Sequence, residues 1–532
     1  MAVSLRGVEG GGEGVAAGRA ARLLQLPDVP WLIGLMAVAC GLRVLYWSGY
    51  GLGDDVIFRG QVNSIVRNHW VLGDNGAYRF SWWFPAALSC RIFGMTEIGM
   101  VLPSLVYSTF GIGLLYAFGK ALWGRPGGIV AALLLTFAPL DFAWSTMVAN
   151  DIVFSFFSGC TILCVLRAFE QEDATRKRRA WAAAAVSLWL AYHAKVSGVL
   201  LVPAVGMICW AKRQRLGREF LTFCGVGALL FAGSALVSYV FFADPLWPLH
   251  SEVKFQGLVG EPAIQHKVGV DILYVYLRWL FQRDSLGDLL YSIYPHVLVA
   301  LVVLSPLLGL RSSLAVFWWF FFVFMGMEFN LQRAGGFWIA GFRNIRHGHA
   351  WLYPLILLLT GYLVSLRARA PRVFHVTLAV LLAVSAWQSV STATKTQQAF
   401  ADRRNALRFL SKLPPKPVYS DFQIHMSMTI FDMEEPKWPL KQLNFMSSDV
   451  RRVELAAVKT GYLVTGGGRE PYYGCIDCIP RAAEVSPDRW QLLREFPGPT
   501  KPTPWRFEPI RVWQAKEASD DQPGEAAPPP TR

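Results

Sequence analysis

The sequence predicts an α-helical polytopic membrane protein with about eleven transmembrane helices and a small C-terminal α/β domain outside the membrane. Hydrophobic residues make up 53% of the 532 positions, and charged residues make up only 17%. The mean hydropathy of +0.34 accompanies repeated long apolar runs, which soluble domains lack. Composition and repeated runs together place the chain among multi-pass membrane proteins.

A helix needs roughly 20 predominantly apolar residues to cross the hydrocarbon core of a membrane. Residues 1–29, rich in Gly and Ala, are predicted to be a disordered cytoplasmic N-terminus. Residues 30–391 are predicted to form the membrane domain. Its eleven predicted spans are 30–49, 99–121, 126–143, 147–168, 180–194, 196–211, 220–243, 286–309, 313–329, 350–366 and 373–391.

Basic clusters indicate the orientation of these spans. With the N-terminus inside, every compact cluster falls on the cytoplasmic side, as the positive-inside rule requires. These clusters are Arg125, Arg176–Arg179, Lys212–Arg218, Arg311 and Arg367–Arg372. The formal charge of +14 is therefore explained by orientation, and nucleic acid is not an expected partner. The loops 50–98, 244–285 and 330–349 and the tail after residue 391 then lie outside.

The first outer loop is predicted to contain two helices lying in the membrane interface. Residues 54–70 and 78–93 alternate apolar and polar residues at roughly helical spacing. The second stretch carries the neighbouring Trp82 and Trp83. Tryptophan is enriched at the headgroup level of membranes, which favours this interpretation.

The C-terminal region changes character. Residues 392–515 are predicted to form a small periplasmic α/β domain, since short strands such as PVYSD and GYLVTG are bounded by Pro and Gly. Residues 516–532 are predicted to be a disordered tail. Cys475 and Cys478 form a CxxC, interpreted as a structural disulfide in an oxidising compartment. The other six cysteines lie in or beside apolar stretches, where Cys is a small hydrophobe.

Acidic residues at the outer ends of spans are the first candidates for chemistry. Asp54 and Asp55 follow the first span in GYGLGDDVIF, and such a pair at a membrane boundary is costly unless it has a partner or a task. The alternative is a helix N-cap. Asp151, in WSTMVANDIVFSFF, is the second candidate, with pairing to a nearby Arg or helix capping as the alternatives. Asp141 lies in the same turn and competes with it.

Basic residues on the outer side are candidates for phosphate binding. Lys195 lies at a tight turn between two apolar segments, where it either extends to the headgroups or neutralises a lipid phosphate. His193, two residues away, supports either role. The loop GFRNIRHGHAWLYP adds Arg343, Arg346, His347 and His349. Arginine binds phosphate through a two-pronged fork, and attraction to anionic headgroups is the alternative.

These motifs, in this order, resemble the GT-C superfamily of membrane glycosyltransferases. The resemblance is greatest to bacterial relatives of protein O-mannosyltransferase and of the aminoarabinose transferase that modifies lipid A. The acidic pair of that family is matched by GDDVIF, and its Pro-containing span start by residues 93–124. Its later outer turns are matched by APLDFAWSTMVANDIVFSFF, HAKVSGVLLVP and ADPLWPLH. Departures are Phe58, where the family often has Tyr, and Ala350 and Trp351, where it usually has an Arg-Tyr pair.

The resemblance, over roughly residues 30–390, implies a GT-C-like membrane enzyme. Such an enzyme transfers a sugar from a polyprenyl-phosphate donor to an acceptor hydroxyl, with inversion and with Asp54 as the general base. Asp55 and Asp151 would orient the acceptor or, with Asp54, bind a divalent cation such as Mg²⁺ or Mn²⁺. Donor-phosphate contacts would come from Lys195, Arg346, Arg343 and Arg59. Substrate-pocket candidates are His193, His347, His349 and Trp82.

The expected location is the bacterial inner membrane, with the bilayer, the lipid-linked sugar and an acceptor as partners. The acceptor is left open among protein hydroxyls, lipid A, other envelope glycans and lipids. One alternative is a transporter or flippase for lipid-linked glycans, which would show two related halves or broken helices; the sequence has no internal repeat. A second alternative is a non-catalytic membrane scaffold with a partner-binding periplasmic domain.

Overall fold

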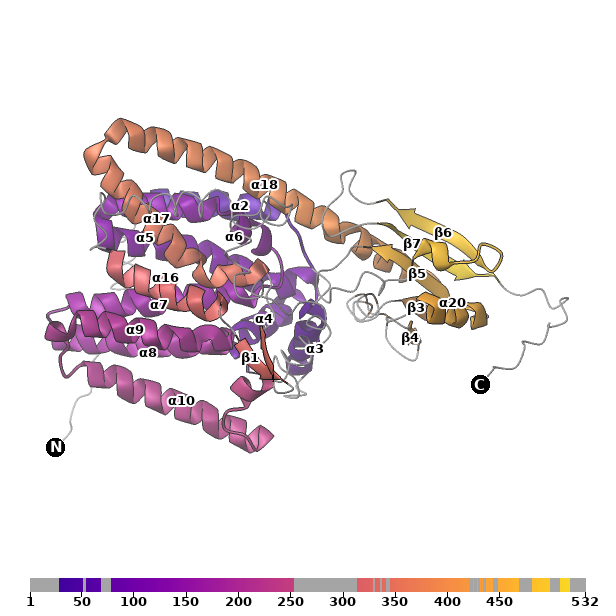
Figure 1. Ribbon diagram of the computed structural model, residues 1–532, viewed down its shortest axis with the longest axis horizontal. Coiled ribbons are helices and arrows are strands. Elements are labelled where there is room, and N and C mark those ends of the chain that lie inside the picture. Colours follow the sequence, from indigo (N-terminus) through magenta and orange to yellow (C-terminus); the bar gives the residue numbers. More distant parts are fainter. Residues whose placement is uncertain are drawn as a thin grey trace, which may run out of the picture.

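A computed structural model shows a bundle of long helices with a small β-sheet at one end (Figure 1). It describes residues 28–50, 54–67, 78–252, 313–328, 331–334, 337–340, 345–420, 437–443, 448–467, 481–497 and 508–516, and the single positions 424, 428, 431 and 433. The predicted span 286–309 and the Cys475–Cys478 motif lie outside these residues. The class predicted from the sequence, a polytopic helical membrane protein with a small C-terminal sheet, is confirmed.

Six helices among the described residues are long and apolar enough to cross a membrane. They are α2 (Asp28–Leu45), α5 (Glu97–Thr136), α7 (Asn150–Glu170), α10 (Phe220–Phe242), α17 (His349–Arg369) and α18 (Pro371–Leu410). Further helices pack beside them, namely α8 (Ala174–Ala194), η1 (Val196–Leu200) with α9 (Leu201–Ala211), and α16 (Leu314–Glu328). Helix α8 has spanning length but carries Arg176–Arg179 in its first turns.

Helix α5 contains two of the predicted spans. The backbone leaves the helical conformation at Trp123 and at Gly124, where φ is +70°. The chain reverses there, and Gly119 and Gly127 bring the two arms into backbone contact. The second arm ends at Thr136, so the predicted span 126–143 was wrong in its end. A separate short helix, α6 (Pro139–Trp144), follows, because a proline has no N–H to continue a helix but suits a helix start.

Helix α18 is longer than its predicted span. Its 40 residues extend for about 60 Å at roughly 1.5 Å per residue, twice the thickness of the hydrocarbon core. Residues 392–410 contain no Pro or Gly to end the helix after the predicted limit at 391. The helix therefore continues out of the bundle and reaches the sheet (Figure 1).

Helix α17 lies at the centre of the bundle. It packs against α5, α7, α16 and α18, and most of its side chains are buried. Two glycines of neighbouring helices make room for its Tyr353, since a Cβ at Gly111 or Gly159 would meet the Tyr353 ring. Small residues at such contacts let membrane helices approach closely. By contrast, α10 buries almost none of its apolar surface in the bundle.

The end of the bundle nearest the sheet carries the helices predicted for the first outer loop. These are α3 (Asp54–Val66) and α4 (Phe80–Phe93), which pack against each other. Helix α4 buries Trp82 and Trp83 and exposes Phe84, Leu88 and Ile92. The exposed three are spaced four residues apart and form one apolar stripe. A hairpin of β1 (Leu331–Ala334) and β2 (Phe337–Ala340) lies at the same end (Figure 1).

The C-terminal sheet has the strand order β4-β3-β5-β7-β6. Its strands are β3 (Val418–Ser420), β4 (Leu440–Gln442), β5 (Tyr462–Gly467), β6 (Trp490–Phe496) and β7 (Glu508–Ala515). Strand β3 pairs in parallel with β4 and β5, whereas β7 pairs antiparallel with β5 and β6. Helix α20 (Ser448–Ala457) and η7 (Ala482–Glu484) complete this mixed α/β unit, in which PVYSD and GYLVTG form strands as predicted.

Candidate active site

The acidic pair begins helix α3. Asp54 is the first residue of this helix, and Asp55 follows with only 4% of its surface exposed. A carboxylate in the first turn of a helix is stabilised by the unpaired backbone N–H groups and the positive end of the helix dipole. The Asp54 side chain lies outside the part of the chain that the structure describes.

Aromatic and basic side chains fill the space between α3 and α4. The rings of Phe58 and Trp82 are 4.8 Å apart between centroids, and Trp82 is fully buried. The guanidinium of Arg79 lies 5.6 Å from the centre of the Phe58 ring. Arg59, one turn after Asp55, is buried as well. Trp82 thus packs against Phe58 of α3, and Arg79 lies near the same Phe58 ring.

Asp151 and Lys195 form a buried ion pair. The Lys195 Nζ lies 2.5 Å from Asp151 Oδ1, and the two side chains are 9% and 1% exposed. Asp151 is the second residue of α7, and Lys195 directly follows the end of α8. Helices α7 and α8 pack along each other, which brings these two ends together. The predicted second acid and the predicted phosphate-binding lysine are therefore neighbours, and each balances the charge of the other.

His349 joins the same cluster from the first position of α17. Its ring is completely buried and lies within electrostatic range of Asp141, Asp151 and Lys195. Its backbone carbonyl accepts a hydrogen bond of 2.5 Å from the Ser155 hydroxyl, one turn along α7 from Asp151. The ends of α7, α8 and α17 thus meet at one buried polar position in the bundle.

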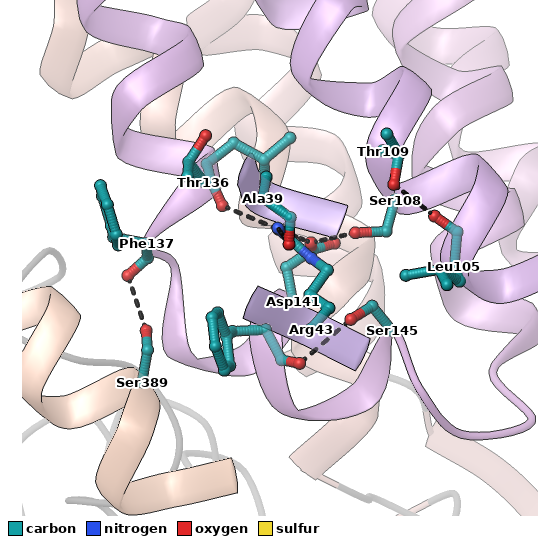
Figure 2. A network of polar contacts seen from close by, with 12 residues as sticks. Ala39, Arg43, Leu105, Ser108, Thr109, Thr136, Phe137, Asp141, Ser145 and Ser389 are labelled. Atoms are coloured by element: carbon teal, nitrogen blue, oxygen red, sulfur yellow. Dashed lines mark hydrogen bonds and ion pairs between the residues drawn. The ribbon is translucent and has the colours of Figure 1, made fainter. Parts of the chain in front are cut away.

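Asp141 belongs to a separate network (Figure 2). Arg43 donates from Nη2 to Asp141 Oδ2 at 2.9 Å, and both side chains are fully buried. The hydroxyl of Ser108 donates to the same oxygen at 2.5 Å, and Arg43 Nη1 also donates to the carbonyl of Ala39 at 3.2 Å. Asp141 therefore links α2, α5 and α6. Of the two competing acids, Asp151 is the one that lies beside Lys195.

His193 is engaged through both ring nitrogens. Nδ1 lies 2.9 Å from the carbonyl oxygen of Tyr78, and Nε2 lies 2.9 Å from the hydroxyl of Ser234. The ring also packs against Phe80 and Trp189. This arrangement ties the start of α4 to α8 and α10.

The predicted basic loop is only partly described. The 3₁₀ turn η5 (Ile345–Gly348) contacts α6 and α17 and so approaches the Asp151 cluster. His347 is half-buried, whereas the side chain of Arg346 and all of Arg343 lie outside the described residues.

Sequence reasoning missed a second charged group beside α3. The hydroxyl of Tyr78 donates to Glu252 Oε2 at 2.6 Å, and Arg79 Nη2 lies 3.2 Å from the same oxygen. Burial raises the pKa of the Tyr78 phenol well above its usual range, so the phenol stays neutral. The adjacent Tyr78 and Arg79, directly before an amphipathic helix, were the only local signal.

A divalent cation needs several oxygen, nitrogen or sulfur ligands that converge on one point. Among the described side chains, no group of three or more His, Cys, Asp or Glu residues is arranged to hold a metal ion. Asp151 Oδ1 faces the Lys195 ammonium, which disfavours a second cation at that oxygen. The alternative role of Asp151 as a cation ligand stays a prediction.

One family matches part of the sequence. The family described as dolichyl-phosphate-mannose-protein mannosyltransferase matches residues 80–239. This stretch runs from the start of α4 into α10 and includes both Asp151 and Lys195. No curated protein matches the chain at a significant level.

Solved structures are similar over most of the chain. ArnT from Cupriavidus metallidurans in the apo state has a TM-score of 0.55 at 12% identity, covering 92% of this chain and 98% of that one. The same protein bound to undecaprenyl phosphate has a TM-score of 0.53 at 13% identity, covering 91% and 98%. The Archaeoglobus fulgidus oligosaccharyltransferase in complex with zinc and sulfate has a TM-score of 0.54 at 11% identity, covering 81% and 68%. The chain shares the fold of these solved structures, in agreement with the fold that its motifs predicted.

Proposed function

We propose that this protein is a membrane glycosyltransferase that moves a sugar from a polyprenyl-phosphate donor to an acceptor hydroxyl. The main support for the proposal is that Thr146 links the segment before the acidic pair to the turn before Asp151. The segment before Asp54 is hydrogen bonded to the turn that leads to Asp151, through Gly49 N–H and the Thr146 carbonyl at 2.8 Å. Both acids therefore start helices at the same end of a GT-C fold, and one similar structure holds undecaprenyl phosphate.

The proposed reaction is a single displacement at the anomeric carbon. The acceptor oxygen attacks that carbon while its proton passes to the Asp54 carboxylate. The bond from the carbon to the phosphate oxygen breaks, and the electron pair leaves with the polyprenyl phosphate. The configuration inverts, and no covalent nucleophile takes part.

Cations beside the acids would stabilise the leaving phosphate. Lys195 is held by Asp151 at 2.5 Å, so a donor phosphate would share an ammonium that is already fixed in place. Arg59, Arg343 and Arg346 are proposed to add further positive charge, and His347 and His349 to line the pocket. Preorganised charge of this kind stabilises a transition state without reorganisation at the moment of reaction.

Asp55 is proposed to orient the acceptor. It is buried directly beside the proposed base, where a second carboxylate can accept a hydrogen bond from a neighbouring sugar hydroxyl. No step in the proposed reaction passes through a metal ion.

The proposed topology follows from the basic clusters. Lys120 and Arg125 pair with Asp28 at the start of α2, whose other end leads to α3. Because successive helices alternate in direction, this turn and the start of α8 lie at the end of the bundle opposite to α3. We assign that end to the cytoplasm. The acidic pair, the Asp151 cluster and the C-terminal sheet then face the periplasm of a bacterial inner membrane.

The test is donor-dependent transfer in isolated membranes. Polyprenyl-phosphate sugars labelled in the sugar would be incubated with membranes that contain or lack the protein, and released polyprenyl phosphate and labelled acceptor would be quantified. Transfer with stoichiometric release of the lipid phosphate supports the proposal. Movement of intact donor across the membrane without cleavage would instead identify a flippase. Mass spectrometry of envelope glycans with and without the protein identifies the acceptor.

A further inference from the structure

The short segment before the acidic pair, residues 46–50, is held from several directions. Trp47 Nε1 donates to Glu97 Oε1 of α5 at 2.7 Å. The Ser48 N–H donates to the Thr146 hydroxyl at 3.0 Å, and the Gly49 N–H donates to the Thr146 carbonyl at 2.8 Å. Thr146 lies in the turn between α6 and α7. A segment of five residues is thus attached to α5 and to the turn that leads to Asp151.

A further attachment comes from far along the chain. Arg404, on the extended part of α18, donates from Nη1 to the carbonyl oxygen of Ser48 across 356 positions of sequence. Arg404 is buried, and its guanidinium lies within electrostatic range of Glu97 and Asp55. One turn later, Phe409 of the same helix packs against Phe496 of strand β6. Helix α18 therefore contacts both the sheet and the segment before the acidic pair.

The attachment of residues 46–50 to α5 and α18 requires a glycine at position 49. Its φ is +73°, in the left-handed region that side chains avoid. A Cβ at this position would also collide with Glu97 Oε1 and Arg404 Nη1, which meet over the Gly49 backbone. Because position 49 has no side chain, Glu97 of α5 and Arg404 of α18 can both lie against residues 46–50.

We propose that Arg404 and Glu97 are positioning residues that fix residues 46–50 and thereby place Asp54 and Asp55 relative to the Asp151 cluster. This inference rests on the proposed function for its kinetic consequence. Neither residue needs to touch the substrate. The sheet is linked to this arrangement, since α18 contacts both the sheet and, through Arg404, residues 46–50.

The first experiment measures the segment itself and does not depend on activity. Hydrogen exchange of peptides covering residues 46–50 would be compared between wild type, Arg404→Met and Arg408→Met in detergent. Arg408 is the matched control, since it lies one turn further on and its side chain donates to Asn405 of its own helix. Arg404→Met is expected to speed exchange of this segment by about 10-fold or more, with Arg408→Met unchanged. Equal exchange in all three proteins overturns the proposal.

The second experiment separates placement from binding. In the transfer assay, Arg404→Met is expected to lower kcat by roughly 10- to 100-fold, as misplacing a catalytic group does, while the donor KM changes less than about 3-fold. Arg404→Lys, which can still donate to Ser48, is expected to recover part of the loss. A rise in donor KM with kcat unchanged would contradict a positioning role. Gly49→Ala is expected to reproduce the loss, and Gly94→Ala is its control.

The Gly94 control is matched in its φ angle. Its φ is +76°, but its nearest neighbour to an added Cβ is Thr96 Cγ2 at 3.6 Å, an ordinary contact. Equal losses in both glycine variants would show that backbone strain alone is responsible and would contradict the role of Glu97 and Arg404. If wild-type protein transfers no sugar from any donor, the proposed function fails, and the exchange experiment still decides whether Arg404 fixes the segment.

Discussion

Lys195 and Asp151 face each other inside the bundle with 2.5 Å between ammonium nitrogen and carboxylate oxygen. They come from the adjoining ends of α8 and α7, and the ring of His349 lies in the same electrostatic cluster. Burying such an ion pair costs desolvation free energy. Removing one of its two side chains leaves the other charge buried without its partner. The pair therefore has consequences for stability that are separable from its proposed role in binding phosphate.

The first prediction concerns this pair. Lys195→Met or Asp151→Asn alone is expected to destabilise the protein, Lys195→Met by roughly 3–5 kcal/mol because it leaves a buried carboxylate unpaired. The double variant is expected to recover part of that loss. Thermal unfolding in detergent measures the difference. Arg452→Met, which removes an exposed pair with Asp449 at 3.7 Å, is the control and should change stability by about 1 kcal/mol or less. Additive losses in the double variant would contradict the pairing.

The second prediction concerns the network of Figure 2. Ser108→Ala is expected to cost about 1.5–3 kcal/mol, because the Ser108 hydroxyl donates to the charged Asp141 carboxylate in a buried place. Ser158→Ala is the matched control. Ser158 is also a buried serine, but its hydroxyl bonds the Phe154 carbonyl of its own helix, so its loss should be smaller. Equal shifts of the unfolding midpoint in the two variants would count against the network.

The third prediction is a pH dependence at Tyr78. Burial raises the pKa of this phenol above its usual range, so the folded state binds the proton more tightly than the unfolded state, whose tyrosine pKa is about 10. The resulting stabilisation is present below pH 10 and is lost as the pH rises towards the folded pKa. Unfolding midpoints measured between about pH 8 and 11 should therefore fall more steeply in wild type than in Tyr78→Phe. Identical slopes would refute this.

The fourth prediction concerns the C-terminal sheet. Arg451 of α20 binds Glu484 through two contacts of 2.8 Å, from Nε and from Nη2, and both side chains are almost completely buried. Arg451→Lys cannot make both contacts, since lysine lacks the planar fork. It is expected to lower the resistance of residues 411–516 to limited proteolysis. Arg452→Met, on the exposed side of the same helix, should leave the proteolysis rate unchanged, and the prediction fails if both variants are cleaved alike.

Local patterns in the sequence predicted much of the fold. Helical spacing in residues 54–70 and 78–93 corresponds to α3 and α4, and the glycines at the two ends of GYLVTG lie at the ends of β5. The predicted ends of helices were less accurate where they depend on contacts with distant parts of the chain. Helix α18 continues past residue 391, where the chain has no Pro or Gly to end it and packs on β6 and β7. The packing leaves no periodic signal in the apolar run.

The candidate site was predictable as residue types but not as pairs. Asp151 and Lys195 each stood out as a charge near an apolar segment, but their contact depends on how α7 packs on α8. Arg404 and Thr146 did not stand out. Their partners are backbone groups of Ser48 and Gly49, and any residue supplies such groups, so no side-chain pattern marks the contact.

The most direct test of the central claim is the turnover of Asp54→Asn. Transfer from a labelled polyprenyl-phosphate sugar would be measured with wild type, Asp54→Asn and the exposed-site control Asp449→Asn, at equal amounts of folded protein. We expect a loss of about 100-fold or more in kcat for Asp54→Asn, the usual contribution of a general base, with wild-type turnover in the control. Full activity of Asp54→Asn would contradict the account.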